Sequence, residues 1–302
     1  MREIKITANE SDQRIDRFLL KYFNDTTRGN LYKLMRKKVF KLNGKPVTKP
    51  ETFLKCDDVL TIYMAEATIE SLRKPVEVVT PDQVGLSIIY EDDDILIVDK
   101  PKGMLTHPDK TEYKNTLSTI VQFYLKHLCT PTFKPAPVHR LDKNTGGLVL
   151  FAKHYESLKY YNALMRERKI EKYYLCICEG KTKPQGEVKG YLTKDEQLNK
   201  VTLSANDRDQ SKFCHTLYKT LTFQKGYSLV EVALLTGRSH QIRVSMAYEG
   251  HPIVGDVKYG GKKRRGETTQ LLHAYKLVIG ERVYTSNSEA IDTFMASLNA
   301  NN

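Results

Sequence analysis

The apolar positions in the first part of the chain follow a helical period and then an alternating one. Intervals of three and four residues separate apolar side chains between residues 14 and 23, as on one face of a helix. Asn43 and Gly44, which favour a tight turn, separate two short apolar runs. The predicted elements are a helix over 14–23, a second helix through Leu31, Leu34 and Met35 with candidate caps at 25–27, a β-hairpin over 39–47 and a strand over 59–63. We therefore expect residues 1–65 to form a small α+β module.

A stretch without a sustained apolar period follows, and after it short apolar runs recur with turn signals between them. Residues 66–85 contain charged residues and prolines, which indicates a linker. The later runs predict strands at 86–90, 95–98, 148–152, 174–178, 201–203 and 229–235, and helices at 116–127 and 155–168. Many short strands with few helices are typical of an α+β domain around a mostly antiparallel sheet. We assign residues 86–295 to this second domain.

Positive charge exceeds negative charge and is concentrated near the amino terminus. The 302 residues include 48 Lys and Arg against 36 Asp and Glu, a formal net charge of +12. This balance favours a polyanionic partner, with nucleic acid as the leading candidate. Nine basic residues and one acidic residue lie between Arg28 and Lys55. The alternative to RNA binding there is a solvated helix face, but such a density of one sign is costly without a polyanion. The candidate phosphate-binding residues are Arg28, Lys33, Arg36, Lys37 and Lys38.

The cysteine spacing, the absence of metal and phosphate motifs, and the lack of long apolar runs indicate which cofactors and which cellular location to expect. The five cysteines form no C-x-x-C pair, so we expect reduced thiols. The sequence has neither zinc-site spacing nor a glycine-rich phosphate loop, so we expect no metal and no nucleotide or redox cofactor. No apolar run approaches the roughly 18 to 20 residues of a membrane span, and the start lacks the apolar core of a signal peptide. We expect a cytoplasmic protein that does not bind membranes.

The run over 139–153 places one carboxylate just before a buried strand. Asp142 follows a guanidinium, Arg140, in a polar loop, and residues 145–147 allow a tight turn before an apolar run. A rigid strand end can hold a catalytic side chain accurately. Asp142 is therefore the candidate reacting residue. The alternative is that Asp142 and Thr145 only make turn hydrogen bonds and that Arg140 pairs with a surface acid.

Four ordered motifs resemble those of the RluA family of RNA pseudouridine synthases. Residues 139–148, H-R-L-D followed by x-x-T-x-G-L, are similar to the family motif that carries the catalytic Asp. Residues 100–107 resemble its K-P-x-G-x-x-x-H segment, and 172–180 its K-x-Y-L-A-L-V-x-G strand. Residues 236–243 resemble its T-G-R-x-H-Q-I-R block. The resemblance covers about residues 87–280.

The resemblance implies the pseudouridine synthase sheet with a central catalytic cleft, and an isomerisation that needs no cofactor. Asp142 would attack the ribose at C1′ or remove a proton at C2′, two routes that both remain open. Arg243 would bind this carboxylate through two hydrogen bonds and keep it ionised. Tyr174 would stack on the uracil and assist removal of the C5 proton, with cross-strand packing as its alternative role.

The resemblance also implies RNA contacts, because the target nucleotide must leave the stacked helix to reach the cleft. Arg140 would fill the space that the flipped nucleotide leaves, or hold its backbone. The 236–243 block would place Arg238, His240 and Gln241 against the substrate. The two helices and hairpin of residues 1–65, with their basic second helix, resemble the S4 RNA-binding domain, which precedes the catalytic domain in several family members.

Two functions of different classes follow. The first is an RNA pseudouridine synthase that acts as a monomer on structured RNA, with 23S ribosomal RNA favoured over transfer RNA because of the S4-like domain and the likeness to members that modify large-subunit RNA. The second is a non-catalytic basic RNA-binding or ribosome-assembly protein. The presence together of Asp142, Tyr174 and Arg243 favours the enzyme, because a binding module has no need of a carboxylate in a basic cleft.

Overall fold

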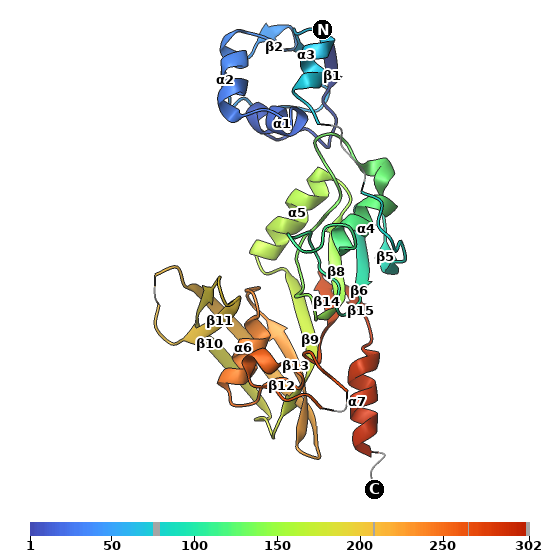
Figure 1. Ribbon diagram of the computed structural model, residues 1–302, viewed down its shortest axis with the longest axis vertical. Helices are drawn as coiled ribbons and strands as arrows, with labels where there is room; N and C mark the ends of the chain where they lie inside the picture. The colour runs from blue at the N-terminus through green and yellow to red at the C-terminus, as the bar shows by residue number, and fades with distance from the viewer. Residues whose placement is uncertain (75–78, 208, 265, 300–302) are drawn as a thin grey trace.

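Two sheets organise the chain. The computed structural model describes residues 1–74, 79–207, 209–264 and 266–299. Within them a four-stranded sheet lies near the amino terminus and an eleven-stranded sheet occupies the rest. Figure 1 shows the amino-terminal module at one end of an elongated molecule. The α+β class predicted from the sequence is confirmed.

The amino-terminal module contains the two helices, the hairpin and the strand that the sequence predicts. Thr27 Oγ1 accepts the N–H of Asn30 at 3.2 Å and so caps the second helix. Asn43 and Gly44 have φ of 51° and 78°, as a two-residue hairpin turn with the twist of its strands requires. The elements are β1 (Arg2–Lys5), α1 (Ile15–Tyr22), α2 (Arg28–Arg36), β2 (Phe40–Leu42), β3 (Lys45–Pro46), β4 (Val59–Ile62) and α3 (Glu66–Ser71), with strand order β1-β4-β2-β3.

Helix α3 lies inside the segment 66–85 that we predict as a linker. Ile69 is fully buried in the same apolar cluster as Phe18 and Leu31, so the packing of the first module includes α3. Ile69 is the one buried side chain of this short helix, and a single apolar position gives no period to recognise. Residues 75–78 of the predicted linker lie outside the described residues.

The large sheet is antiparallel except at one strand pair among the described residues, β8 with β14. Its order is β11-β10-β12-β13-β9-β14-β8-β6-β5, with β15 beside β14 and β7 beside β8. The predicted mostly antiparallel sheet is therefore confirmed. The strands are β5 (Ser87–Glu91), β6 (Ile95–Lys100), β7 (Ala136–Pro137), β8 (Gly146–Ala152), β9 (Ile170–Glu179), β10 (Gln185–Asp195), β11 (Lys200–Ser204), β12 (Lys212–Gln224), β13 (Tyr227–Leu234), β14 (Leu272–Ile279) and β15 (Arg282–Thr285).

Helices pack on both faces of this sheet, because successive strand residues point to opposite sides. On β6, Val98 packs in one apolar cluster with α4 and α6, whereas Ile97 packs in another with α5. On β9, Cys176 and Cys178 share the α6 face, and Ile177 faces α7. The helices are α4 (Leu117–Tyr124), α5 (Tyr155–Arg166), α6 (Gln241–Tyr248) and α7 (Glu289–Asn299), with short 3-10 turns η1 (Lys126–Leu128) and η2 (Val257–Tyr259).

The two modules meet at the start of α5. Asn9 Oδ1 accepts the N–H of Tyr155, the first residue of α5, at 3.0 Å. The buried Glu10 accepts hydrogen bonds from the hydroxyls of Thr130 and Thr132 at 3.1 and 3.0 Å. These polar contacts hold the amino-terminal module against the domain that contains the large sheet.

In the described part of the chain, no helix is long and apolar enough to cross a membrane.

Candidate active site

The loop that carries Asp142 is fixed by backbone contacts that do not use its carboxylate. Thr145 donates its N–H to the Asp142 carbonyl at 3.0 Å, so the predicted turn uses the main chain of Asp142 and not its side chain. Beyond it, Gly147 has φ 112°, and an added Cβ would overlap the backbone of Ala274 where β8 lies against β14. Only glycine fits this position.

Buried groups from residues 100–107 hold the same loop from behind. The ammonium of Lys100 is fully buried and donates to the carbonyls of Pro101, Met104 and Lys143 at 3.0, 2.8 and 3.1 Å. Burial lowers the pKa of Lys100 to about 7, while the charges of Asp142 and Asp99 oppose that shift. The K-P-x-G-like segment therefore braces the residue after Asp142 and supplies no side chain to the cavity.

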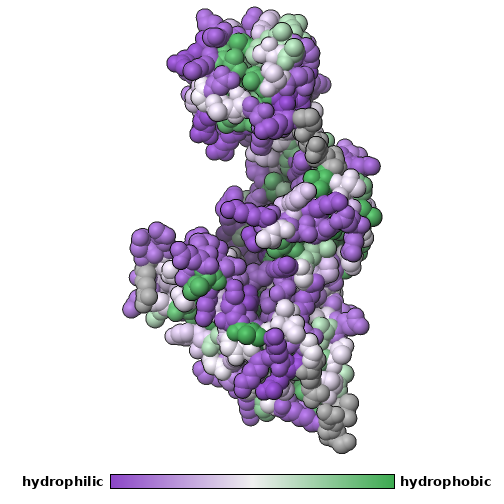
Figure 2. Space-filling model, viewed as in Figure 1, coloured by the Kyte–Doolittle hydropathy of each residue, from purple (hydrophilic) through white to green (hydrophobic). Residues whose placement is uncertain are grey.

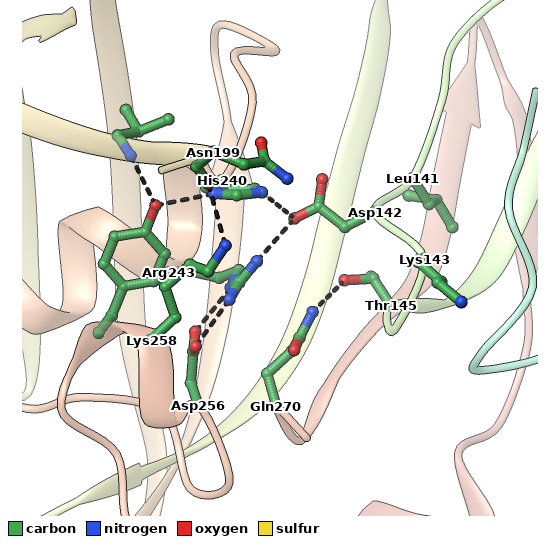
Figure 3. Close-up of polar contacts among 12 residues, drawn as sticks. Leu141, Asp142, Lys143, Thr145, Asn199, His240, Arg243, Asp256, Lys258 and Gln270 are labelled. Atoms are coloured by element: carbon green, nitrogen blue, oxygen red, sulfur yellow. Dashed lines mark hydrogen bonds and ion pairs between the residues drawn. The ribbon is translucent and has the colours of Figure 1, made fainter. Parts of the chain in front are cut away.

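Arg243 binds a different carboxylate from the one we predict. Its Nε and Nη2 donate to Asp256 Oδ2 and Oδ1 at 2.6 and 2.7 Å, a bidentate pair in which both side chains are buried (Figure 3). The remaining Nη1 lies 3.5 Å from Asp142 Oδ2. Burial alone would lower the pKa of Arg243, but the hydrogen bonds and charge of Asp256 raise it. The expected fork onto Asp142 is therefore wrong; Asp256 holds the guanidinium, and one N–H faces Asp142.

His240 provides the second neighbour of the Asp142 carboxylate. It is the N-cap residue of α6, in the left-handed conformation with φ 54°, and its Nε2 lies 4.0 Å from Asp142 Oδ2. Burial lowers the pKa of His240; the charges of Asp142 and Asp256 oppose this shift and those of Arg243 and Lys258 add to it. Both His240 and Arg243 thus approach Oδ2, and among the described residues Oδ1 has no hydrogen-bond partner.

Tyr174 lies on β9 on the face that carries α6, with 5% of its surface exposed. Burial raises the pKa of Tyr174, and the nearby charge of Asp142 raises it further. The phenol is therefore protonated in the free site. It packs in the core cluster and also lines the cavity beside Asp142, so its packing leaves the predicted stacking role open.

A cavity of about 320 Å³ joins these groups, a size in the range of small-ligand sites. All of the predicted catalytic and substrate-binding residues line it: Arg140, Asp142, Tyr174, Arg238, His240, Gln241 and Arg243. Arg140 and Arg238 are exposed at its rim. Gln241 is not available to substrate, because its amide accepts from the N–H of Arg238 and the hydroxyl of Thr236 and donates to the His215 carbonyl and Thr216. Gln241 instead holds the loop that carries Arg238.

Three residues of the site are missed by the sequence reasoning. Asp256 and Tyr259 come from the segment after α6, and Lys172 lies two residues before Tyr174 on the same strand face. The Nζ of Lys172 lies 3.5 Å from Met165 Sδ and has no carboxylate partner in the described part of the chain. Burial lowers the pKa of Lys172. No sequence pattern pairs Asp256 with Arg243; the need for a counter-charge follows only from the burial of the guanidinium in the folded chain.

The basic residues predicted to bind RNA lie away from the cavity. Arg28, Lys33 and Arg36 are exposed on α2, and Lys37 and Lys38 are exposed just after it. None of them pairs with a carboxylate of the described residues. Figure 2 shows a broad concavity between the amino-terminal module and the arm that carries β10 and β11, with a mainly hydrophilic surface.

Comparison with known proteins agrees with this architecture. The family described as RNA pseudouridylate synthase matches residues 94–248. An RNA pseudouridine synthase of Mycoplasma capricolum is 31% identical over 286 residues, 92% of this chain and 91% of its own. Ribosomal large subunit pseudouridine synthase D of Borreliella burgdorferi is 30% identical over 288 residues, 91% of this chain and 84% of its own. The solved structure of human RNA pseudouridylate synthase domain containing 4 is 21% identical, with a TM-score of 0.59 over 70% of this chain and 93% of that one, and shares the fold.

The matched segment contains Asp142, Tyr174 and Arg243 and covers half of the chain. It also contains the loop, the strand and the helix that place these side chains in one cavity. The chain therefore belongs to the RluA-type family of RNA pseudouridine synthases, and it is an RNA-modifying isomerase.

Proposed function

We propose that this enzyme converts specific uridines of large-subunit ribosomal RNA to pseudouridine, with Asp142 as the reacting carboxylate. The observation that carries the assignment of Asp142 is the one-sided environment of its carboxylate. Oδ2 faces Arg243 and His240, whereas Oδ1 has no partner among the described residues and Asp142 lines the cavity. One oxygen is thus oriented by the protein while the other is available to the ribose.

The reaction rearranges bonds within one nucleotide. The N1–C1′ bond of uridine breaks, the uracil turns, and C5 bonds to C1′; the C5 proton leaves and N1 gains a proton, so no atom or electron is gained or lost. Oδ1 of Asp142 either forms a bond to C1′ or removes the proton at C2′. In both routes the carboxylate must be charged, and Arg243 supplies the adjacent positive charge.

Tyr174 is assigned to stacking and proton relay. Its ring forms a wall of the cavity, which suits stacking against a uracil. Because burial keeps the phenol protonated, it can take the C5 proton only while passing on its own. Arg140 and Arg238, exposed at the rim, are assigned to the RNA backbone around the flipped nucleotide.

The amino-terminal module is proposed as the S4-like RNA clamp. Its exposed basic helix α2 offers several cations without acid partners among the described residues, and phosphate contacts of this kind supply sequence-independent affinity. The ribosomal target rests on the relative named as a large-subunit pseudouridine synthase and on this clamp. Distal contacts would then select among many similar uridines, since the cavity holds about one nucleoside.

The test is a map of pseudouridines in total RNA from cells with and without the gene. We expect sites in large-subunit ribosomal RNA to disappear, and to return with the wild-type gene and with the control Asp93→Asn, an exposed acid outside the cavity. Asp142→Asn should not restore them. Loss of sites only in transfer RNA would contradict the ribosomal target, and restoration by Asp142→Asn would contradict the role of Asp142.

A further inference from the structure

We infer that Tyr259 is a positioning residue that fixes the tautomer of His240 and so directs an uncharged N–H at the reacting carboxylate. This inference rests on the proposed role of Asp142. Tyr259 lies at the end of η2 and belongs to none of the motifs that point to the activity. Its hydroxyl lies 2.7 Å from His240 Nδ1, on the side of the imidazole opposite Asp142.

The hydrogen bonds of Tyr259 determine which imidazole nitrogen carries the proton. The N–H of Val201 donates to the Tyr259 oxygen at 2.9 Å, so the hydroxyl proton is free to be donated to His240 Nδ1. The proton of the neutral imidazole is then on Nε2, which faces Asp142 Oδ2. In the other tautomer Nδ1–H would point at Tyr259, the hydroxyl proton would lack this acceptor, and a lone pair of Nε2 would face the carboxylate. Both effects favour Nε2–H.

The charge balance at Asp142 explains the use of an uncharged donor. Asp256 occupies two nitrogens of Arg243, so the guanidinium reaches Asp142 with Nη1 alone, at 3.5 Å. One distant N–H orients a carboxylate weakly. The neutral imidazole points Nε2–H at the same oxygen from 4.0 Å, so the positive end of its N–H dipole faces Oδ2 without a second cation. Both neighbours are then on the Oδ2 side of the carboxylate, and Oδ1 is left to react.

The same link connects the active site to the arm formed by β10 and β11. Val201 belongs to β11, and the turn before it is held by Lys258, whose Nζ donates to the Asn199 carbonyl at 3.0 Å. Lys258 and Tyr259 closely follow the counter-ion Asp256. Figure 3 shows Asn199 and Lys258 beside His240, Arg243 and Asp142. The segment 256–259 therefore contacts both neighbours of Asp142 and the turn at the base of the arm.

The tautomer is measured directly by NMR of protein with ¹⁵N-labelled histidine, with the His240 signals assigned by their loss in His240→Gln. We expect the wild type to show the Nε2–H form and Tyr259→Phe to show a mixture, because the phenyl ring keeps its place near Arg243 and only the hydroxyl is lost. Tyr248→Phe removes an exposed hydroxyl on α6 and should leave the spectrum unchanged. An Nδ1–H form in the wild type would overturn the inference, whatever the role of Asp142.

Kinetics separate an effect on the tautomer from an effect on packing. Tyr259→Phe should lower kcat about tenfold, the effect of one oriented hydrogen bond, with KM and RNA affinity unchanged. His240→Gln carries an amide N–H that needs no tautomer, so adding Tyr259→Phe to it should cost no further activity. Melting temperatures of all three variants control for folding. A full multiplicative loss in the double variant, or a loss confined to KM, would overturn the inference.

Discussion

Asp256 is predicted to set both the stability of the fold and the geometry of the reacting carboxylate. Its two hydrogen bonds of 2.6 and 2.7 Å to Arg243 lie in the interior, with side chains 1% and 9% exposed. Removing one partner of such a pair leaves an uncompensated charge and costs about 3 to 5 kcal/mol. Asp256→Ala should therefore lower the melting temperature by about 6 to 20 °C, at roughly 2 to 4 °C per kcal/mol for a domain of this size. Asp256→Asn, which keeps one acceptor oxygen, should lie at the low end.

The activity of Asp256→Asn tests the second half of this prediction. Without its counter-ion, the guanidinium fork of Arg243 is free to turn to Asp142 and engage the oxygen that faces the substrate. We expect kcat to fall by about a hundredfold or more, equivalent to roughly 3 kcal/mol, when tritium release from C5-labelled RNA is measured well below the melting temperature. Asp93→Asn is the control. A melting temperature within about 2 °C of wild type, or normal kcat in the folded variant, would refute the reasoning.

Three further predictions concern other buried or basic groups. Leu150 donates its N–H to His139 Nε2 at 3.2 Å, and burial lowers the pKa of His139 to about 3. Below about pH 6.5 the unfolded chain therefore binds a proton at His139 that the folded chain does not bind. The free energy of unfolding then falls as the pH falls, by up to about 1.4 kcal/mol per pH unit. Urea unfolding at pH 7 and pH 5 should show a smaller loss in His139→Gln, and an equal loss would contradict the assignment. Lys172→Met should weaken RNA binding in filter assays without lowering the melting temperature, because the half-buried ammonium lines the cavity and has no carboxylate partner among the described residues. The exposed Lys219→Met should change neither property. A destabilised Lys172→Met with normal RNA binding would make Lys172 structural. Charge reversal on α2 should flatten the dependence of RNA affinity on salt, by roughly 0.7 to 0.9 in log–log slope for each phosphate that the variant no longer binds, and an unchanged slope would remove the module from RNA binding.

The sequence predicts the strands with regular apolar patterns and misses those in which one face is polar. Strands β6 and β8 are buried along nearly their whole length and stand out as apolar runs. Strand β12 is long, but Thr216 and Cys214 alternate with exposed or half-exposed residues, and its buried face is partly polar. Strand β12 is stabilised by backbone pairing with β10 and β13, which its own residue pattern does not predict.

In the candidate site, too, some residues could be predicted from the sequence and others could not. Residues within the motifs, such as Asp142, Tyr174 and His240, converge on one cavity because loop, strand and helix ends meet there. The partner of Arg243 lies thirteen positions further along the chain, and no local pattern pairs it with the guanidinium. Likewise the sequence presents Gln241 as a polar binding residue, although the folded chain uses all of its donor and acceptor capacity. Long-range pairing of this kind is fixed by the fold and not by local spacing.

The central claim is that Asp142 reacts with the substrate, and Asp142→Asn tests it most directly. The substitution keeps the size and polarity of the side chain and removes no cation that could bind phosphate, so RNA affinity should stay near that of the wild type. Tritium release from C5-labelled RNA should be undetectable under single-turnover conditions, with Asp93→Asn as the active control. Release by Asp142→Asn within about tenfold of the wild-type rate, a barrier change of only about 1.4 kcal/mol, would contradict the account.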